Sequence, residues 1–304
     1  MSYVPEEVEF TNVNFTSLTD IINELSDGSK RAKIKVSGFD AMSVILYDKI
    51  SSAVKDSEVE NGDDVLYMMR LIKSPAEIEI LKKVWEICDT GYKAILESEL
   101  VGLTEIQAAA IGEKAARDAG AEHIVFSILC SGERTNTIIG RPTEKVIRES
   151  DMIMSSLAVQ YQGYIASDEW PFVAGRKLLE EQERLIYHLV KAEDIGVNSI
   201  KNGVKSREVV KKIRNYFRDN KLEEYDIYPP IHGNGLAEAE SPYPDEHSDK
   251  EFLTGMGINF DVSLFGIPGV GSNRIEEGFI VTEKGVITLS KLISSLRVKF
   301  LSKY

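Results

Sequence analysis

The sequence has little cysteine and no long apolar run. Of its 304 residues two are cysteine, Cys88 and Cys130, which excludes a disulfide framework and leaves no Cys/His spacing suited to zinc. No apolar run reaches the ~18 residues of a membrane-spanning helix. The opening MSYVPEEVEF lacks the basic and apolar segments of a signal peptide. We therefore expect a cytoplasmic protein.

The chain also lacks an excess of positive charge. Its 36 lysine and arginine residues face 49 acidic residues, a net charge of −13. A chain this acidic gains no counterion-release energy, so we expect neither nucleic acid nor a membrane as partner. Hydrophobic residues at 43% and charged residues at 28% are typical of a folded globular protein. The length suits two domains.

Residues 1–69 have the pattern of a small α/β unit. We expect a helix at residues 17–25, a strand at 32–40 and a helix at 42–54. The run VLYMMRLI at residues 65–72, after a turn at residues 61–64, is interpreted as a strand.

Residues 70–304 alternate pairs of helices with strands. Ser74 and Pro75 are expected to start one helix, and the capping box of Thr104 and Gln107 a second. Strands follow, two of them joined at Gln162, and then helices at residues 178–200 and 206–219. Short strands are expected up to residue 289. The order suggests two related halves.

Several polar residues after residue 150 could carry chemistry. They are Asp168 and Glu169 at the end of a hairpin, His232 in PPIHGNG, Asp261 in INFDVSLF and Glu276 in RIEEGFIV. A carboxylate in such a mostly apolar strand is costly unless it is paired or binds a cation. Two acids and a histidine on neighbouring strands suit a hard or borderline metal ion. In the alternative, Asp261 and Glu276 face solvent on edge strands, and His232 is a loop residue that bonds to the backbone.

From Arg70 onward the sequence resembles one known family. RLIKSPAEIEILKKVWEICDTG, GLTEIQ, YQGY, HGNGL and RIEEGFIVTEKG follow the order found in the creatinase, Xaa-Pro aminopeptidase and prolidase family. The resemblance implies the α+β pita-bread fold, a curved antiparallel sheet with two pairs of helices on its outer face. Residues 1–69 resemble a truncated N-terminal α/β domain of the family, and residues 70–304 resemble its catalytic domain.

The metal site that the resemblance implies is incomplete. Active members hold two ions with two aspartates, one histidine and two glutamates. Ser156 and Ser167 stand at the aspartate positions, and Asp168 could replace the second only through a one-residue bulge. The implied ligands of a single ion are therefore His232, Asp261 and Glu276, with Asp168 as a candidate fourth.

Other family positions are also altered. Ile139 and Ala239 stand where the family has two further histidines. Glu169 falls where creatinase has a substrate-binding glutamate. Creatinase acts without metal and uses a histidine at the position of Ile139 as its acid/base group. An isoleucine cannot transfer protons, so the resemblance does not support a creatinase mechanism here. The acidic segment at residues 238–251 is expected to be a solvated loop.

Two functions follow from the resemblance. The first is a hydrolase related to Xaa-Pro dipeptidases, acting on a peptide or small amide, with His232 and Glu276 as catalytic residues and at most one Mn, Co or Zn ion. The second is a pseudoenzyme that needs no metal and binds a peptide or protein partner in its cleft. The resemblance also implies a homodimer.

Overall fold

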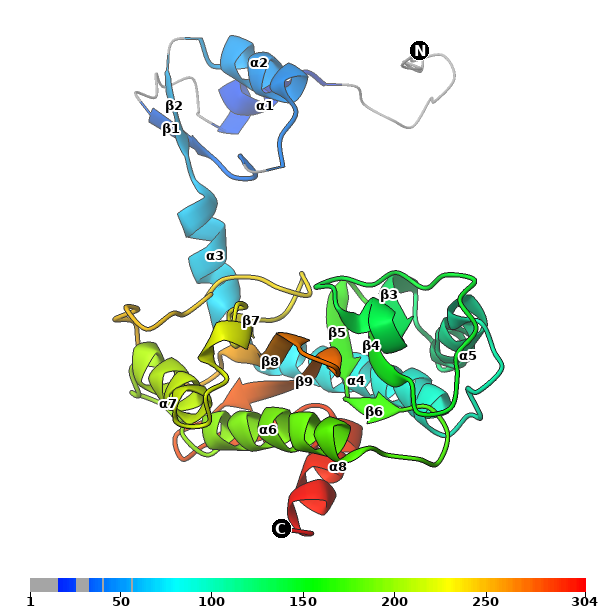
Figure 1. Cartoon of the computed structure of the whole chain (residues 1–304). Coiled ribbons are helices and arrows are strands. Elements are labelled where there is room, and N and C mark those ends of the chain that lie inside the picture. The colour runs from blue at the N-terminus through cyan, green and yellow to red at the C-terminus, as the bar shows by residue number, and fades with distance from the viewer. Residues whose placement is uncertain (1–15, 26–32, 40, 56) are drawn as a thin grey trace. The chain divides into compact units, whose positions relative to one another are not determined.

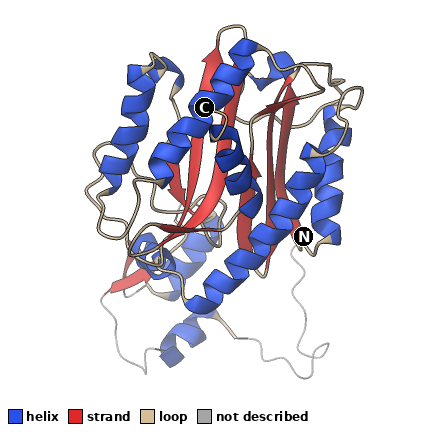
Figure 2. Cartoon of the chain, turned by 90° about the horizontal axis from the view of Figure 1, so that it is seen from below, coloured by secondary structure: helices blue, strands red, loops and turns tan. Residues whose placement is uncertain are grey.

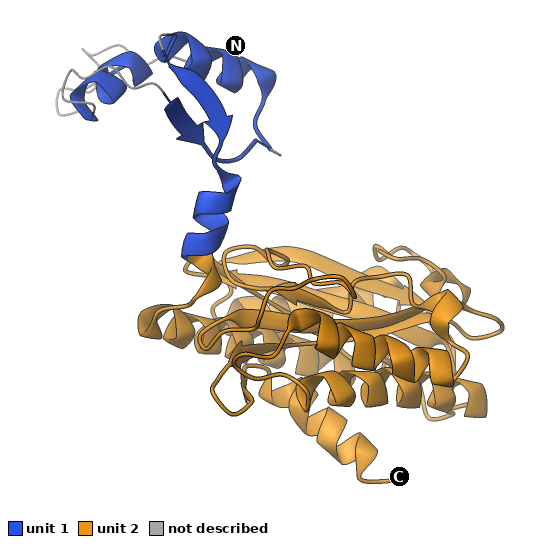
Figure 3. Ribbon diagram, turned by 90° about the vertical axis from the view of Figure 1, so that its left-hand side faces the viewer, with its two compact units in different colours: residues 1–69 blue, residues 70–304 orange. Residues whose placement is uncertain are grey.

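The computed structural model describes residues 16–25, 33–39, 41–55 and 57–304, and it divides the chain into two compact units (Figure 3). Unit 1 is Met1–Met69 and unit 2 is Arg70–Tyr304. The boundary expected from the sequence lies between the same two residues.

Unit 1 is a small α/β unit. Its elements are α1 (Leu18–Leu25), β1 (Lys33–Val36), α2 (Val44–Ala53), β2 (Glu58–Asn61) and the start of α3 (Asp63–Leu71). Strands β1 and β2 pair in parallel, with Lys33 opposite Glu58, and α2 connects them. Residues 32 and 40, at the ends of the strand expected at 32–40, lie outside the described residues.

The strand predicted at residues 65–72 is wrong, because this segment forms α3. Asp63 and Asp64 lie in the first turn of the helix and Arg70 lies in its last turn. Charges of these signs at these ends interact favourably with the helix dipole. The leucine and methionine residues of the run also have high helix propensity. This local preference for a helix outweighs the tendency of a short apolar run to form a strand.

Unit 2 contains the other helices and strands that the described residues form (Figure 1). Serine and threonine cap the first two helices as predicted, since Ser74 and Thr104 each complete a capping box. The elements in chain order are α4 (Pro75–Leu96), α5 (Glu105–Asp118), β3 (His123–Ser131), β4 (Met152–Tyr161), β5 (Tyr164–Glu169), β6 (Phe172–Val173), α6 (Glu180–Val197), α7 (Ser206–Asp219), β7 (Ile231–Gly233), β8 (Gly257–Ile267), β9 (Gly271–Val281), β10 (Val286–Thr288) and α8 (Lys291–Leu301).

The strands of unit 2 form one antiparallel sheet in two halves. Among the described residues the sheet has eight strands, in the order β3-β4-β5-β9-β8-β7, with β6 beside β4 and β10 beside β9. Gln162 and Gly163 join β4 to β5 with φ values of 48° and 83°, as a two-residue hairpin turn requires. The halves meet where β5 pairs with β9, through Glu169 and Glu276.

Helices α4, α5, α6 and α8 pack on one face of this sheet (Figure 2), and α7 packs on α6. Helices α4 and α5 lie against β3, β4 and β5, and α6 and α8 lie against β8 and β9. Trp85 of α4 is fully buried against Gly278 of β9, and Phe260 of β8 packs against Gly196 of α6. Because side chains alternate along a strand, Asn259 and Asp261, the neighbours of Phe260 on β8, point to the opposite face.

Within the part of the chain that the structure describes, no helix has both the length and the apolar character to cross a membrane.

Candidate metal centre

A row of polar residues crosses the open face of the sheet where its two halves meet. Ser156 of β4 lies opposite Glu169 of β5, Glu169 opposite Glu276 of β9, and Glu276 opposite Asp261 of β8. Directly opposed residues of antiparallel strands point to the same face, so the row shares one surface. All four side chains are buried. The alternative that Asp261 and Glu276 face solvent is therefore wrong.

His232 joins this row from the edge strand β7. It is 2% exposed and lies opposite Asn259 of β8. Its Nδ1 lies 3.0 Å from the carbonyl oxygen of Gly233, and its Nε2 lies 3.2 Å from Glu276 Oε1. A carbonyl only accepts, so Nδ1 carries a proton and Nε2 is the atom that faces the carboxylates.

Asparagines position the Glu276 carboxylate. The Asn259 amide donates to Glu276 Oε1 over 2.6 Å, and the Asn234 amide donates to Asn259 Oδ1 over 2.5 Å. Both asparagines are buried. This chain of hydrogen bonds fixes the rotamer of Glu276, as outer partners of metal ligands commonly do.

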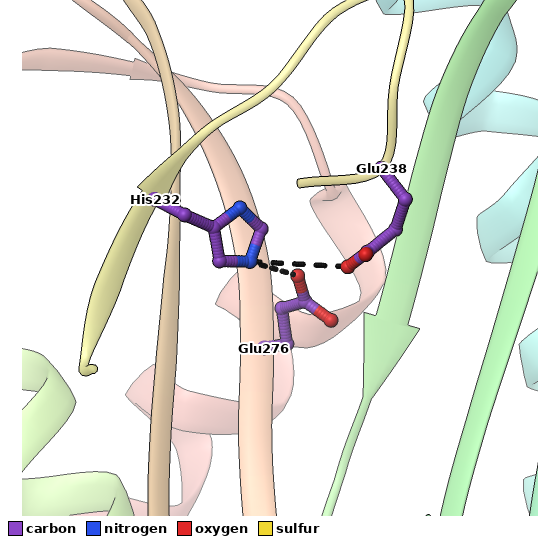
Figure 4. Close-up of side chains that lie close together, drawn as sticks. All are labelled: His232, Glu238 and Glu276. Carbon is purple, nitrogen blue, oxygen red and sulfur yellow. Dashed lines mark ion pairs between the residues drawn. The ribbon is translucent and has the colours of Figure 1, made fainter. Parts of the chain in front are cut away.

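Glu238 enters the same site, although the sequence analysis places it in a solvated loop. Its Oε1 lies 3.8 Å from His232 Nε2, and its side chain is 23% exposed. Figure 4 shows Glu238 and Glu276 directed at the same ring nitrogen from different segments. The loop between β7 and β8 has no strand periodicity, so no pattern in the sequence reveals which of its acids turns inward.

Arg274 is a second residue that the sequence analysis missed. Its guanidinium contacts the Glu169 carboxylate, with Nε 3.3 Å from Oε2, and its Nε lies 3.8 Å from Asp261 Oδ1. It also lies over the ring of Tyr228, 5.2 Å from the centroid. Arg274 precedes Glu276 by two positions on β9, so the alternation of side chains along the strand was a signal that both face the site.

Asp168 does not reach the site. It follows Ser167 and precedes Glu169 on β5, and regular alternation turns it to the helical face. There it is fully buried beside Cys88 and Asp89 of α4. No bulge interrupts the register of β5 at this point, so we leave Asp168 out of the ligand set.

The two serines contact each other instead of facing a ligand separately. Ser156 Oγ and Ser167 Oγ are 3.0 Å apart, and both are buried. A hydrogen bond between them satisfies a donor of one hydroxyl and an acceptor of the other.

The site opens into a cavity of about 610 Å³. Its walls combine apolar side chains with charged ones from the row described above. The lining includes the apolar side chains of Ile106, Ala109, Phe126, Ile128 and Ile139, and the polar side chains of Glu169, Glu238, Asp261, Arg274 and Tyr228. A cavity that combines apolar walls with convergent polar groups is typical of a small-molecule or peptide site.

The buried carboxylates of the site outnumber the positive charges beside them, and this raises the pKa values of several groups. Burial, together with the Glu276 carboxylate, raises the pKa of Glu238 to about 8. Burial also raises the pKa of Asp261 to about 6, although Arg274 opposes the shift. For His232, burial disfavours protonation, but Glu276 and Glu238 outweigh it and raise the pKa to about 10. Each shift favours uptake of a proton, and a bound cation would relieve the same charge.

Comparison with known proteins identifies the family. Residues 79–283 match the profile of metallopeptidase family M24. This chain belongs to that family. It is 30% identical to the Xaa-Pro dipeptidase of Pyrococcus horikoshii over 246 residues, which are 80% of this chain and 69% of the relative. It is 29% identical to the Xaa-Pro dipeptidase of Pyrococcus furiosus over 288 residues, which are 94% and 80% of the two chains.

The M24 fold is confirmed by solved structures. The prolidase from Pyrococcus furiosus superposes with a TM-score of 0.82 at 27% identity, over 92% of this chain and 81% of the other. The pita-bread architecture predicted from the resemblance is therefore correct, as is membership of the creatinase and prolidase family.

An M24 protein implies a divalent metal, and one group of side chains fits such an ion. His232, Glu238 and Glu276 each offer a donor atom, and these atoms all lie within 4.8 Å of one another. One imidazole and two carboxylates suit a borderline divalent ion. The second ring nitrogen of a metal-bound histidine usually donates a hydrogen bond to a carboxylate or a backbone carbonyl, and His232 Nδ1 makes such a bond with the Gly233 carbonyl.

Proposed function

We propose that this M24 protein binds a peptide in its cleft and holds at most one divalent ion there, without the two-ion chemistry of a conventional Xaa-Pro dipeptidase. The observation that carries the proposal is the contact between Ser156 and Ser167. The resemblance places the two ligand aspartates at these positions. A neutral hydroxyl is a far weaker ligand than a carboxylate, and these two hydroxyls bond to each other.

The residues of the cleft suit a one-ion site. In this proposal His232 and Glu276 hold the ion, with the ring oriented by Gly233 and the carboxylate by Asn259. A bound ion would polarise a peptide carbonyl or lower the pKa of a water molecule. Glu169, which lines the cavity and pairs with Arg274, is the candidate contact for the substrate.

A second candidate function is binding without catalysis. Ile139 lines the cavity with 65% of its surface exposed, where the resemblance has a histidine. An isoleucine at this place adds apolar contact area but can neither transfer a proton nor stabilise developing charge. This feature favours a pseudoenzyme that holds a peptide, or a segment of a protein partner, in the cleft.

One assay tests the proposal and separates its two forms. The full chain is supplied with Mn²⁺, Co²⁺ or Zn²⁺ and assayed on Xaa-Pro dipeptides, beside a His232→Ala variant. Weak hydrolysis that the substitution abolishes would identify a one-ion enzyme, and no hydrolysis with any ion would identify the binding form. Turnover that depends on a second bound ion would overturn the proposal.

A further inference from the structure

Glu238 faces His232 from a segment that no regular element constrains. It lies between β7 and β8, whereas His232 belongs to β7 and Glu276 to β9. Three separate segments thus bring donor atoms to within 4.8 Å of one another (Figure 4). Convergence of this kind is typical of a ligand site, because each ligand approaches the centre from a different side.

The carboxylate oxygens that meet at His232 can only accept hydrogen bonds when they are ionised. Two carboxylates lie 3.2 Å and 3.8 Å from Nε2 of His232, while its Nδ1 is engaged by the Gly233 carbonyl. Such an arrangement is favourable in two states. Either the ring is a cation, or a neutral ring and both carboxylates share a bound cation.

Asp261 has a different partner. Its Oδ1 lies 3.8 Å from Arg274 Nε, and the same guanidinium contacts both oxygens of Glu169. The Arg274 side chain is 7% exposed and also lies over the rings of Tyr228 and Phe265. These contacts hold the guanidinium in place, so Arg274 supplies the positive charge for Glu169 and Asp261.

The charges then separate into two groups. One group is Glu169 and Asp261 around Arg274, and the other is Glu238 and Glu276 beside His232. A divalent ion in the second group would balance both of its carboxylates without displacing Arg274 from the first. Buried carboxylates are stable when they are paired or coordinate a metal, and this division satisfies both conditions.

We propose that Glu238, together with His232 and Glu276, is a ligand of a single divalent ion, and that Asp261 remains the partner of Arg274. This inference rests on the proposed function, since it names the ligands of its one ion. It replaces the ligand set of His232, Asp261 and Glu276 that the resemblance implies.

The test is a titration of the metal-free full chain with Co²⁺, followed by calorimetry and by the visible absorption of the bound ion. The wild type is compared with Glu238→Gln, Asp261→Asn and Glu113→Gln. Glu113 lines the same cavity from α5 and stands outside the group of converging donors, so its substitution is the matched control. Thermal unfolding checks that each variant is folded.

We expect one equivalent of Co²⁺ in the wild type and in Glu113→Gln. In Glu238→Gln, affinity should fall by about 100-fold or more and the absorption bands should change, because a ligand atom is lost. In Asp261→Asn, affinity should fall by less than about 10-fold with unchanged bands, since only a nearby charge is removed.

The outcomes distinguish this inference from the proposed function. The wild type binds one Co²⁺ in the first outcome that would contradict this inference, and Glu238→Gln leaves the affinity for it unchanged or Asp261→Asn lowers that affinity more than Glu238→Gln does. Either result would overturn only the assignment of Glu238 as a ligand. No binding of Co²⁺ would also overturn it, while leaving the proposed binding of a peptide intact. Two tight equivalents would overturn the proposed function itself.

Discussion

Asp168 is a buried carboxyl group on the helical face of the sheet. Burial, and then the nearby carboxylate of Asp89, raises its pKa well above the ordinary value. Asp89 itself accepts hydrogen bonds from Ser290, Lys291 and Leu292 at the start of α8. Asp168 thus keeps its proton more firmly in the folded chain than in the unfolded one, so its contribution to stability is lost as the pH rises through its raised pKa.

The variant Asp168→Asn tests this placement. An asparagine is neutral at every pH, so the variant should lack this loss of stability at high pH. We expect it to match the wild type near pH 4 and to exceed it by about 1–3 kcal/mol at pH 9, the cost of a buried unsatisfied group. Urea unfolding at both pH values measures the difference. A variant that is less stable than the wild type at pH 9 would contradict the placement.

At the level of residues, His232, Asp261, Glu276 and Glu169 were expected to lie in one site, and the structure places them on one face of the sheet. The expectation that these residues share a site came from the family resemblance. The spacing of the residues alone also allowed Asp261 and Glu276 to face solvent. Arg274 could have been found from its alternation with Glu276. Glu238 could not, because the direction of a loop side chain depends on tertiary contacts that no local pattern records.

Contacts between elements depend on close packing of a helix against a strand. Trp85 of α4 lies directly over Gly278 of β9, and a Cβ atom built on Gly278 would overlap the indole ring. Trp85 is fully buried, so the ring has no room to move away. Gly278 is therefore the position at which α4 can approach the half of the sheet that carries Glu276.

The variant Gly278→Ala tests this contact. Overpacking in a dense core typically costs about 1–3 kcal/mol, and we expect a loss of unfolding free energy in or above that range. Gly285→Ala is the matched control, because a Cβ at Gly285 meets no atom within 4 Å. Chemical unfolding of both variants measures the costs. Equal stability of the two variants would contradict the packing described here.

Most elements were predictable from local signals. The N-caps Ser74 and Thr104 marked the starts of α4 and α5, and Gln162 marked the hairpin between β4 and β5. The run at residues 65–72 was misjudged because a short apolar run has no periodicity that separates a strand from a helix. Its charged ends, which favour the helix, are visible in the sequence and were given too little weight.

For the whole molecule, the boundary expected at residue 70 came from the start of the resemblance at Arg70, which is also the first residue of the second compact unit. The main cluster of buried hydrophobic residues runs from Leu81 to Ile293, within unit 2. The pairing of the two halves through Glu169 and Glu276 could not be read from the sequence, because it joins strands more than a hundred residues apart. That pairing creates the site.

The most direct test of a one-ion cleft is the number of ions bound per chain. The purified full chain is dialysed against an excess of Mn²⁺, Co²⁺ or Zn²⁺, freed of loosely bound ions and measured by elemental analysis against protein concentration. With Ser156 and Ser167 bonded to each other and Arg274 held between Glu169 and Asp261, we predict at most one tightly bound equivalent. Two tightly bound equivalents per chain would contradict this.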